Sequence, residues 1–234
     1  MGDIQVLKRS YRRKQKEIRA RLAQFRRFLH EPVCWTYPEN EMILAPSNRA
    51  HHERLFEELC FCILAANTSA QMGMKTVDSI RPLLHTAEPK EMTAHLKGIY
   101  RFINLRPQYI THCREYLGII EGDSGNLHEI LQSIDDPHHL REFLANNTGI
   151  KGIGYKEASH FLRNMGFFGY AILDKHIINT MHECGVLENN KTPSSGKAYL
   201  EMEKKYLQFA HDLKIDSDEL DLLLWSEKTG KILK

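Results

Sequence analysis

Residues 146–178 read NNTGIKGIGYKEASHFLRNMGFFGYAILDKHII, and this stretch decides the fold. Residues 141–148 predict one helix, and residues 155–165 predict a second helix whose apolar side chains recur at helical spacing. Between them, the segment IKGIG at positions 150–154 predicts a tight turn. The stretch therefore predicts two helices joined by a hairpin, followed by a glycine-rich break and a third helix that begins at Asp174.

The predicted hairpin has the features of a phosphate-binding site. Gly152 and Gly154 tolerate a positive φ and allow another backbone to approach closely. Backbone N–H groups in a turn that enters a helix are unpaired, and the helix dipole adds positive potential there. The side chain of Lys151 places a cation beside them. An ordinary helix–turn–helix connection explains the glycines equally well, so both interpretations stay open on this feature alone.

Lys156 and Asp174 extend the interpretation from binding to chemistry. An amine can attack a sugar carbon, and a carboxylate can stabilise the positive charge that develops there. A solvated lysine is almost fully protonated at neutral pH, so a nucleophilic lysine must be desolvated or crowded by other cations. The alternative is a lysine that only contacts phosphate and an aspartate that only caps a helix.

Two motifs carry a family resemblance, Gly152-Ile153-Gly154-Tyr155-Lys156 and Leu173-Asp174-Lys175-His176-Ile177. They resemble the helix–hairpin–helix DNA glycosylase superfamily, with its glycine-rich turn and catalytic aspartate. The resemblance implies that Lys156 is the catalytic amine of a bifunctional member, which removes a base and then cuts the backbone. It also implies that Asp174 is the catalytic carboxylate. Many relatives have proline where this chain has Lys151, which leaves the turn less rigid but adds a positive charge.

The run ELCFCILAANTSA at residues 58–70 and the terminal Lys234 resemble the short type 2 branch of 8-oxoguanine DNA glycosylase/AP lyases. This resemblance covers roughly residues 50–234 and implies contacts with the bases. Asn67 matches the position of the side chain that fills the gap left by a flipped nucleotide. Trp225 matches the aromatic residue that stacks on the damaged guanine, and Lys234 matches the C-terminal lysine that helps to recognise it.

These candidate base contacts also have structural explanations. Asn67 can cap the helix predicted at residues 70–84, Trp225 can belong to the buried face of an amphipathic helix, and Lys234 can be a frayed terminus. Phe102, in a short connector, is a further candidate for stacking on a base, and it can equally be a core residue. Both explanations remain for each residue.

We expect no metal at the site. The pairs His51-His52 and His138-His139 do not share a helix face, and no third ligand is suitably spaced. The chain has five cysteines, at positions 34, 60, 62, 113 and 184. They form neither a disulfide framework nor the C-terminal cluster that holds an iron–sulfur centre in some relatives. The superfamily resemblance allows a structural monovalent cation on the carbonyls of the hairpin.

The net charge of +2 conceals an asymmetry. Residues 1–30 contain ten basic and two acidic residues, a net charge of +8, which leaves −6 for the rest of the chain. Residues 5–29 have a helical pattern, so their cations indicate a solvated face or an electrostatic contact with the DNA backbone. No apolar run is long enough for a membrane span or a secretory signal. We therefore expect a cytoplasmic, nucleoid-associated or nuclear protein that is not secreted.

We predict an all-α protein of two lobes, with a catalytic cleft between them that accepts a flipped nucleotide. Residues 48–168 are expected to form a helical bundle that ends in the helix–hairpin–helix. Residues 1–47 and 169–234 are expected to form the second lobe. Beyond the central stretch, the patterns predict helices at 5–29, 48–66, 70–84, 88–96, 107–121, 126–133, 174–184, 197–213 and 216–226.

The predicted function is that of a monomeric DNA repair enzyme. It would excise 8-oxoguanine from duplex DNA through a Schiff base on Lys156 and then cleave the strand by β-elimination. One alternative is a bifunctional glycosylase that acts on oxidised pyrimidines. Two others are a non-catalytic helix–hairpin–helix module that only binds DNA, and a helical bundle that uses its basic first helix on an acidic protein.

Overall fold

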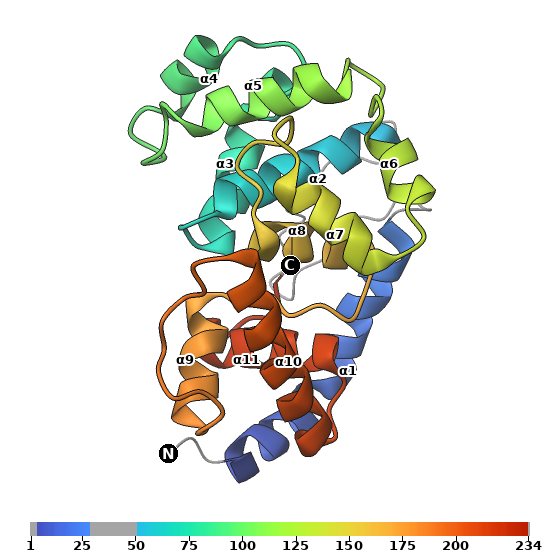
Figure 1. Cartoon of the computed structure of the whole chain (residues 1–234). Coiled ribbons are helices and arrows are strands. Elements are labelled where there is room, and N and C mark those ends of the chain that lie inside the picture. The colour runs from blue at the N-terminus through green and yellow to red at the C-terminus, as the bar shows by residue number, and fades with distance from the viewer. Residues whose placement is uncertain (1–3, 29–50, 234) are drawn as a thin grey trace. The chain divides into compact units, whose positions relative to one another are not determined.

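The computed structural model describes residues 4–28 and 51–233, which form helices joined by loops (Figure 1). Within these ranges no strand occurs, and the only pairing of strand type is an isolated bridge between Ile120 and Asp123. The predicted all-α class is confirmed. The helices are α1 (Ile4–Phe28), α2 (His51–Ala65), α3 (Ala70–Ile80), the 3₁₀ helix η1 (Arg81–Leu83), α4 (Pro89–Leu96), α5 (Arg106–Leu117), α6 (Leu127–Ser133), α7 (Pro137–Asn146), α8 (Tyr155–Asn164), α9 (Lys175–Glu183), α10 (Gly196–Leu213) and α11 (Ser217–Thr229).

The chain divides into two compact units. We call Phe28–Met165 the hairpin unit, and Met1–Arg27 with Gly166–Lys234 the Asp174 unit. The sequence placed the second boundary between residues 168 and 169, and the first, between 47 and 48, lies outside the described residues. Among the described helices, none combines the length and the apolar character that crossing a membrane requires.

Helix α2 forms the centre of the hairpin unit. Leu55, Leu59 and Ile63 are fully buried and Cys62 is nearly so, at the spacing of one helix face. The helix packs against α3, α5, α6 and α8, and Figure 1 shows it between α5 and α8. This packing against α8 supports the second helix of the hairpin from behind.

Two predicted helix boundaries in the hairpin unit are wrong. Helix α5 ends at Leu117 and not at 121, because Gly118 adopts a left-handed conformation with φ 65° and closes the helix. Tyr116, near the end of α5, and Ile120, beyond it, are 49% and 63% exposed. Helix α7 begins at Pro137 and not at 141, because the carboxylate of Asp136 accepts hydrogen bonds from the first backbone N–H groups.

In the Asp174 unit, α1 has a buried apolar side and contacts α11 through polar and charged side chains. Ile18 and Phe25 of α1 are fully buried. The carboxylate of Glu227 accepts hydrogen bonds from Ser10 and from Lys14, at 2.6 and 2.8 Å. Burial works to raise the pKa of Glu227, but these two bonds lower it on balance. The carboxylate therefore stays ionised where α1 meets α11.

Candidate active site

The turn between α7 and α8 forms the hairpin that the sequence predicts. Gly152 has a φ of 82°, and a Cβ at this position would lie 2.6 Å from a ring carbon of Tyr109. The residue must be glycine both for its backbone conformation and for the close approach of Tyr109. Gly154 differs from the prediction, because its φ is −106° and it serves as the N-cap of α8 in extended backbone. A positive φ is therefore needed at one of the two predicted positions.

The hairpin presents unpaired backbone donors. The amides of Lys151, Gly152 and Ile153 have no hydrogen-bond acceptor within the described part of the chain. Ile150 and Ile153 are buried and anchor the turn, whereas the side chain of Lys151 is exposed. Three consecutive N–H groups beside an exposed ammonium, at the start of a helix, can hold one phosphate group.

Arg106 lies behind this turn, and sequence patterns did not identify it. Its side chain is only 7% exposed, and the guanidinium would be 3.3 Å from a Cβ on Gly152. One nitrogen donates to the carbonyl of Ala66 at 3.3 Å, while Nε has no acceptor among the described residues. A buried guanidinium adds positive potential at the hairpin. An arginine near the start of α5 gave no periodic signal that could have revealed this contact.

Lys156 occupies the first turn of α8 and pairs with its neighbour in sequence. Its ammonium lies 2.9 Å from one oxygen of Glu157, and the two side chains are 28% and 17% exposed. The other oxygen of Glu157 accepts a hydrogen bond from the amide of Gly154 at 3.3 Å. Glu157 thus joins the hairpin backbone to the lysine, which the sequence analysis did not anticipate. An acid at the third position of a helix is the signal that could have identified it.

Asp174 is the N-cap of α9 in the Asp174 unit, and both of its oxygens accept hydrogen bonds. The backbone N–H of Ile177 donates to Oδ1 at 2.8 Å, and the indole N–H of Trp225 donates to Oδ2 at 2.7 Å. The capping role that the sequence allowed is thus present. Trp225 comes from α11, so the carboxylate is fixed from two helices.

The chain leading to Asp174 is held by buried polar side chains of α10. Tyr199 donates to the carbonyl of Ala171 at 2.5 Å and accepts from the amide of Leu173 at 3.2 Å. Glu203 accepts from the amide of Ala171 at 2.8 Å. These bonds satisfy backbone groups of an extended, buried segment, which fixes where α9 begins. Sequence reasoning missed both residues, and no local pattern could have revealed them, because each bonds to a segment that is distant in the sequence.

Asn67 lies in the turn between α2 and α3 and is exposed, with a φ of 60°. The proposed capping role is wrong, because Ser69 is the N-cap of α3 and its hydroxyl accepts from the amide of Met72 at 3.1 Å. The carbonyl of Asn67 accepts a hydrogen bond from Arg101. The backbone of this turn is therefore tied down, and the Asn67 side chain extends from it.

Phe102 is half-buried and lies between two guanidinium groups. The Cζ atoms of Arg101 and Arg106 are 4.4 and 5.4 Å from the centre of its ring. The ring of Tyr100 packs against it edge-on at 5.8 Å between centroids. Phe102 is therefore neither a fully buried core residue nor an isolated exposed aromatic side chain.

Two buried cysteines of the hairpin unit are unsuited to nucleophilic chemistry. Burial raises the pKa of the Cys113 thiol to about 12, and burial raises the pKa of Cys60 well above its usual value. Both therefore remain thiols at neutral pH, and the thiolate is the reactive form. Within the described ranges, no group of three or more metal-binding side chains occurs.

The structure gathers the predicted site residues into three groups. Lys151, Gly152, Gly154 and Lys156 lie in one hairpin of the hairpin unit. In the Asp174 unit, Asp174 and Trp225 meet through a hydrogen bond. Asn67 and Phe102 lie in loops of the hairpin unit, where Arg101 contacts both of them. The predicted contact at residue 234 lies outside the described residues.

Comparison with known proteins gives a family match over most of the chain. A family model described as 8-oxoguanine DNA glycosylase matches residues 42–215. The 8-oxoguanine DNA glycosylase/AP lyase of Picrophilus torridus is 42% identical over 183 residues, which cover 77% of this chain and 81% of the relative. The relative of the same name from Aquifex aeolicus is 35% identical over 240 residues and covers 100% of both chains.

Two solved structures extend the similarity to the fold. The crystal structure of Methanocaldococcus jannaschii 8-oxoguanine DNA glycosylase has a TM-score of 0.78 at 33% identity, covering 99% of this chain and 95% of that chain. The M. jannaschii enzyme in complex with 15mer DNA containing 8-oxoguanine has a TM-score of 0.77 at 31% identity, covering 98% of this chain and 100% of that chain. The similarity in sequence and in fold thus includes nearly the whole chain.

Proposed function

The chain belongs to the 8-oxoguanine DNA glycosylase family, and from this premise we propose that Lys156 and Asp174 carry out its reaction. The sequence-based prediction of an 8-oxoguanine DNA glycosylase/AP lyase is confirmed by the family match and by the relatives. The assignment of residues rests on the position of Lys156. It lies in the first turn of α8, directly after the hairpin whose three amides are unpaired. A phosphate bound there would bring a nucleotide next to the amine.

Lys156 supplies the nucleophile. Its neutral amine donates an electron pair to C1′ of the damaged nucleotide, the glycosidic bond breaks, and its electron pair leaves with the base, which takes up a proton. The amine then loses a proton, the sugar ring opens, and a Schiff base joins Lys156 to C1′. Loss of a proton from C2′ breaks the bond between C3′ and its phosphate, which is the β-elimination that cuts the strand.

In the resting enzyme Lys156 is held in an ion pair with Glu157, with 2.9 Å between its Nζ atom and a carboxylate oxygen. An ammonium group has no electron pair to donate. Lys156 must therefore leave this partner and give up a proton before it attacks. Glu157 meanwhile continues to cap the hairpin through the amide of Gly154.

Asp174 stabilises the positive charge that develops on the sugar as the base departs. The hydrogen bonds from Ile177 and Trp225 hold both carboxylate oxygens in place, so the group need not reorganise during the reaction. A fixed negative charge is worth more in the transition state than in the ground state, because only there is the sugar cationic.

The remaining contacts of the proposal concern duplex DNA that contains oxidised guanine. Asn67 would fill the gap left by the flipped nucleotide, and Phe102 would stack on an exposed base. Trp225 would present one face to the damaged base while its N–H remains on Asp174. Lys234 would complete base recognition from the C-terminus. The protein would act as a monomer in the compartment that holds DNA, the cytoplasm with its nucleoid or the nucleus.

The chemistry requires no metal and no iron–sulfur cluster, and a structural monovalent cation would bind the hairpin carbonyls. The donors fit such an ion, because backbone carbonyl oxygens are typical ligands of hard cations. The carbonyl of Lys151 accepts only a weak hydrogen bond, from the thiol of Cys113 at 3.5 Å. The ion would stiffen the turn and take no part in the reaction.

Borohydride reduction during turnover of an 8-oxoguanine duplex tests the proposal, because it converts the Schiff base into a stable adduct. Wild-type protein should form the adduct and nick the strand. Lys156→Gln should do neither, while Lys175→Gln, which removes an exposed lysine next to Asp174, should do both. An adduct that survives in Lys156→Gln would overturn the assignment of the nucleophile.

A parallel reaction tests the competing functions. If thymine-glycol duplex were cleaved in preference to 8-oxoguanine duplex, the enzyme would be an oxidised-pyrimidine glycosylase. Binding of damaged duplex without any nicking would indicate a DNA-binding module.

A further inference from the structure

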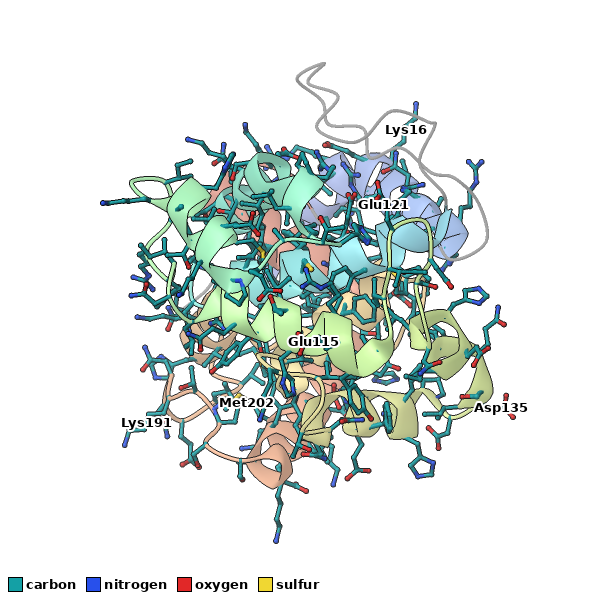
Figure 2. The ribbon with its side chains drawn as sticks, turned by 90° about the horizontal axis from the view of Figure 1, so that it is seen from above. Lys16, Glu115, Glu121, Asp135, Lys191 and Met202 are labelled. Atoms are coloured by element: carbon teal, nitrogen blue, oxygen red, sulfur yellow. The ribbon has the colours of Figure 1, made fainter. Side chains whose placement is uncertain are left out.

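Helix α1 has a buried face and, opposite to it, an exposed basic face. Ile18, Leu22 and Phe25 are at most 3% exposed and mark the buried side. The exposed side carries four cations at helical spacing, which we call the α1 basic face: Arg9, Arg12, Arg13 and Lys16. Figure 2 shows Lys16 extending away from the ribbon. Four cations spaced i, i+3, i+4 and i+7 share one side of a helix.

Other cations of α1 already have acidic partners. Lys14 pairs with Glu227 at 2.8 Å, and Arg19 pairs with Glu219 at 2.7 Å. These two pairs dock α1 on α11 and account for the positive charge on that side of the helix. Lys14 and Arg19 therefore serve to dock the helix, unlike the four cations of the α1 basic face.

The α1 basic face has no such compensation. Arg9, Arg12 and Lys16 form no ion pair with any described residue, and Arg13 acts only at longer range on Glu227. Cations three or four positions apart repel one another and destabilise a helix by roughly 0.2–0.5 kcal/mol per pair. Four such pairs occur among these residues. A helix that keeps this repulsion is suited to a ligand that neutralises it.

We propose that the α1 basic face binds phosphates of duplex DNA outside the lesion, as a contact independent of sequence. From Arg9 to Lys16 the helix extends for about 10 Å, since each residue advances it by about 1.5 Å. That length corresponds to about three phosphates of one strand at about 3.4 Å per base pair. Guanidinium groups, which form three of the four cations, bind phosphate with two parallel hydrogen bonds.

The choice of DNA rests on the proposed function, because duplex DNA is the polyanion on which this enzyme acts. Helix α1 precedes the residues matched by the family model, which begin at position 42. A contact on this helix would increase the affinity for undamaged duplex beyond what the hairpin alone provides. It would hold the protein on DNA while it encounters lesions, without contributing to the chemical step.

The test is the affinity for an undamaged duplex, measured by fluorescence anisotropy at several salt concentrations. The quadruple variant Arg9→Gln, Arg12→Gln, Arg13→Gln and Lys16→Gln should lose at least tenfold affinity at low salt. The slope of log affinity against log salt should fall by about 0.9 for each phosphate that the variant no longer neutralises, or by about 3 in all. Its single-turnover rate on 8-oxoguanine duplex at saturating enzyme should be unchanged.

A charge-matched control comes from the same unit. Lys191, Lys197, Lys205 and Lys214 are exposed, and their replacement by glutamine changes the net charge by the same amount. This control should change affinity by less than twofold. Equal losses in both quadruple variants, or an unchanged salt slope in the α1 variant, would overturn the proposal and leave this face for another anionic partner.

A second variant guards against misfolding of α1. Replacement of the three arginines by lysine keeps the charge, and it should retain most of the affinity and of the salt slope. A loss as large as that of the glutamine variant would contradict an electrostatic contact. Because the readout uses undamaged DNA, its failure is distinct from failure of the proposed reaction, which trapping reports.

Discussion

The indole N–H of Trp225 donates a hydrogen bond to the Oδ2 atom of Asp174 at 2.7 Å. The residue that the family resemblance assigns to stacking on the base therefore also holds the carboxylate of Asp174. The half-buried ring lies edge-on to His176, with 6.4 Å between centroids, and α11 carries it to the start of α9. Under the proposed function, recognition of the lesion and orientation of Asp174 would share one side chain.

Trp225→Phe separates these two roles. Phenylalanine keeps an aromatic face but removes the N–H, and a hydrogen bond to a charged group contributes about 1.5–3 kcal/mol. We expect the single-turnover excision rate to fall by roughly tenfold or more, with little change in affinity for the lesion duplex. Trp225→Leu, which removes the face as well, should also weaken binding. Wild-type rates in Trp225→Phe would limit this residue to contact with the base.

Glu157→Gln tests the resting ion pair. Glutamine still accepts a hydrogen bond from the amide of Gly154, so the cap of α8 survives, but the charge opposite Lys156 is lost. The amine is then free of its resting partner. The excision rate should rise by a few-fold, since such part-exposed pairs contribute up to about 1 kcal/mol.

The measurement is the single-turnover excision rate on the 8-oxoguanine duplex, compared with that of the wild type. A lower rate in the variant would contradict this account and indicate that Glu157 takes part in the reaction.

Gly152→Ala and Gly154→Ala form a matched pair in the hairpin. Alanine at 152 must adopt a φ of 82° and displace the ring of Tyr109, whereas at 154 the backbone is extended and the nearest atom, on Glu157, lies 3.4 Å away. Gly152→Ala should lower the free energy of unfolding by about 1–3 kcal/mol and weaken DNA binding. Gly154→Ala should change both only slightly. Urea unfolding and anisotropy measure the two effects, and equal losses would contradict this account of the turn.

Tyr199→Phe tests the support of the segment before Asp174. The change leaves the amide of Leu173 without an acceptor, which costs about 1–3 kcal/mol of stability, and it frees the chain that sets the start of α9. We expect excision to slow as well.

The control for this prediction is Tyr206→Phe in the same helix, whose hydroxyl donates to the carbonyl of Ser217 at 2.6 Å. It should also lose stability, but excision at a permissive temperature should stay at the wild-type rate. Equal slowing in both variants would mean that stability, and not the position of Asp174, accounts for the effect.

Local patterns predicted the hairpin well. Ala158, Phe161 and Leu162 recur at helical spacing and are fully buried, and the glycine at 152 marks the turn. Such features depend on a few neighbouring residues, so the sequence contains their signal. The prediction of the end of α5 was wrong for a related reason. Tyr116 and Ile120 continue a helical spacing, although Gly118 has already ended the helix.

Contacts between distant residues were not predictable in the same way. The bond from Trp225 to Asp174 joins positions 51 residues apart, and Glu203 reaches the amide of Ala171 across 32 residues. Neither contact follows from periodicity, because each joins a helix to a segment that is distant in the sequence. Arg106 behind Gly152 belongs to the same class. The sequence therefore supplied the candidate reacting groups, whereas the residues that hold them in place required the structure.

The most direct test of the central claim is to locate the sugar on the trapped protein. The adduct between the protein and an 8-oxoguanine duplex is reduced with borohydride and digested with nuclease and protease. The masses of the resulting peptides then identify the modified residue. The account predicts the remnant of deoxyribose on Lys156. Modification of Lys151, Lys175 or another amine, with Lys156 unmodified, would contradict it.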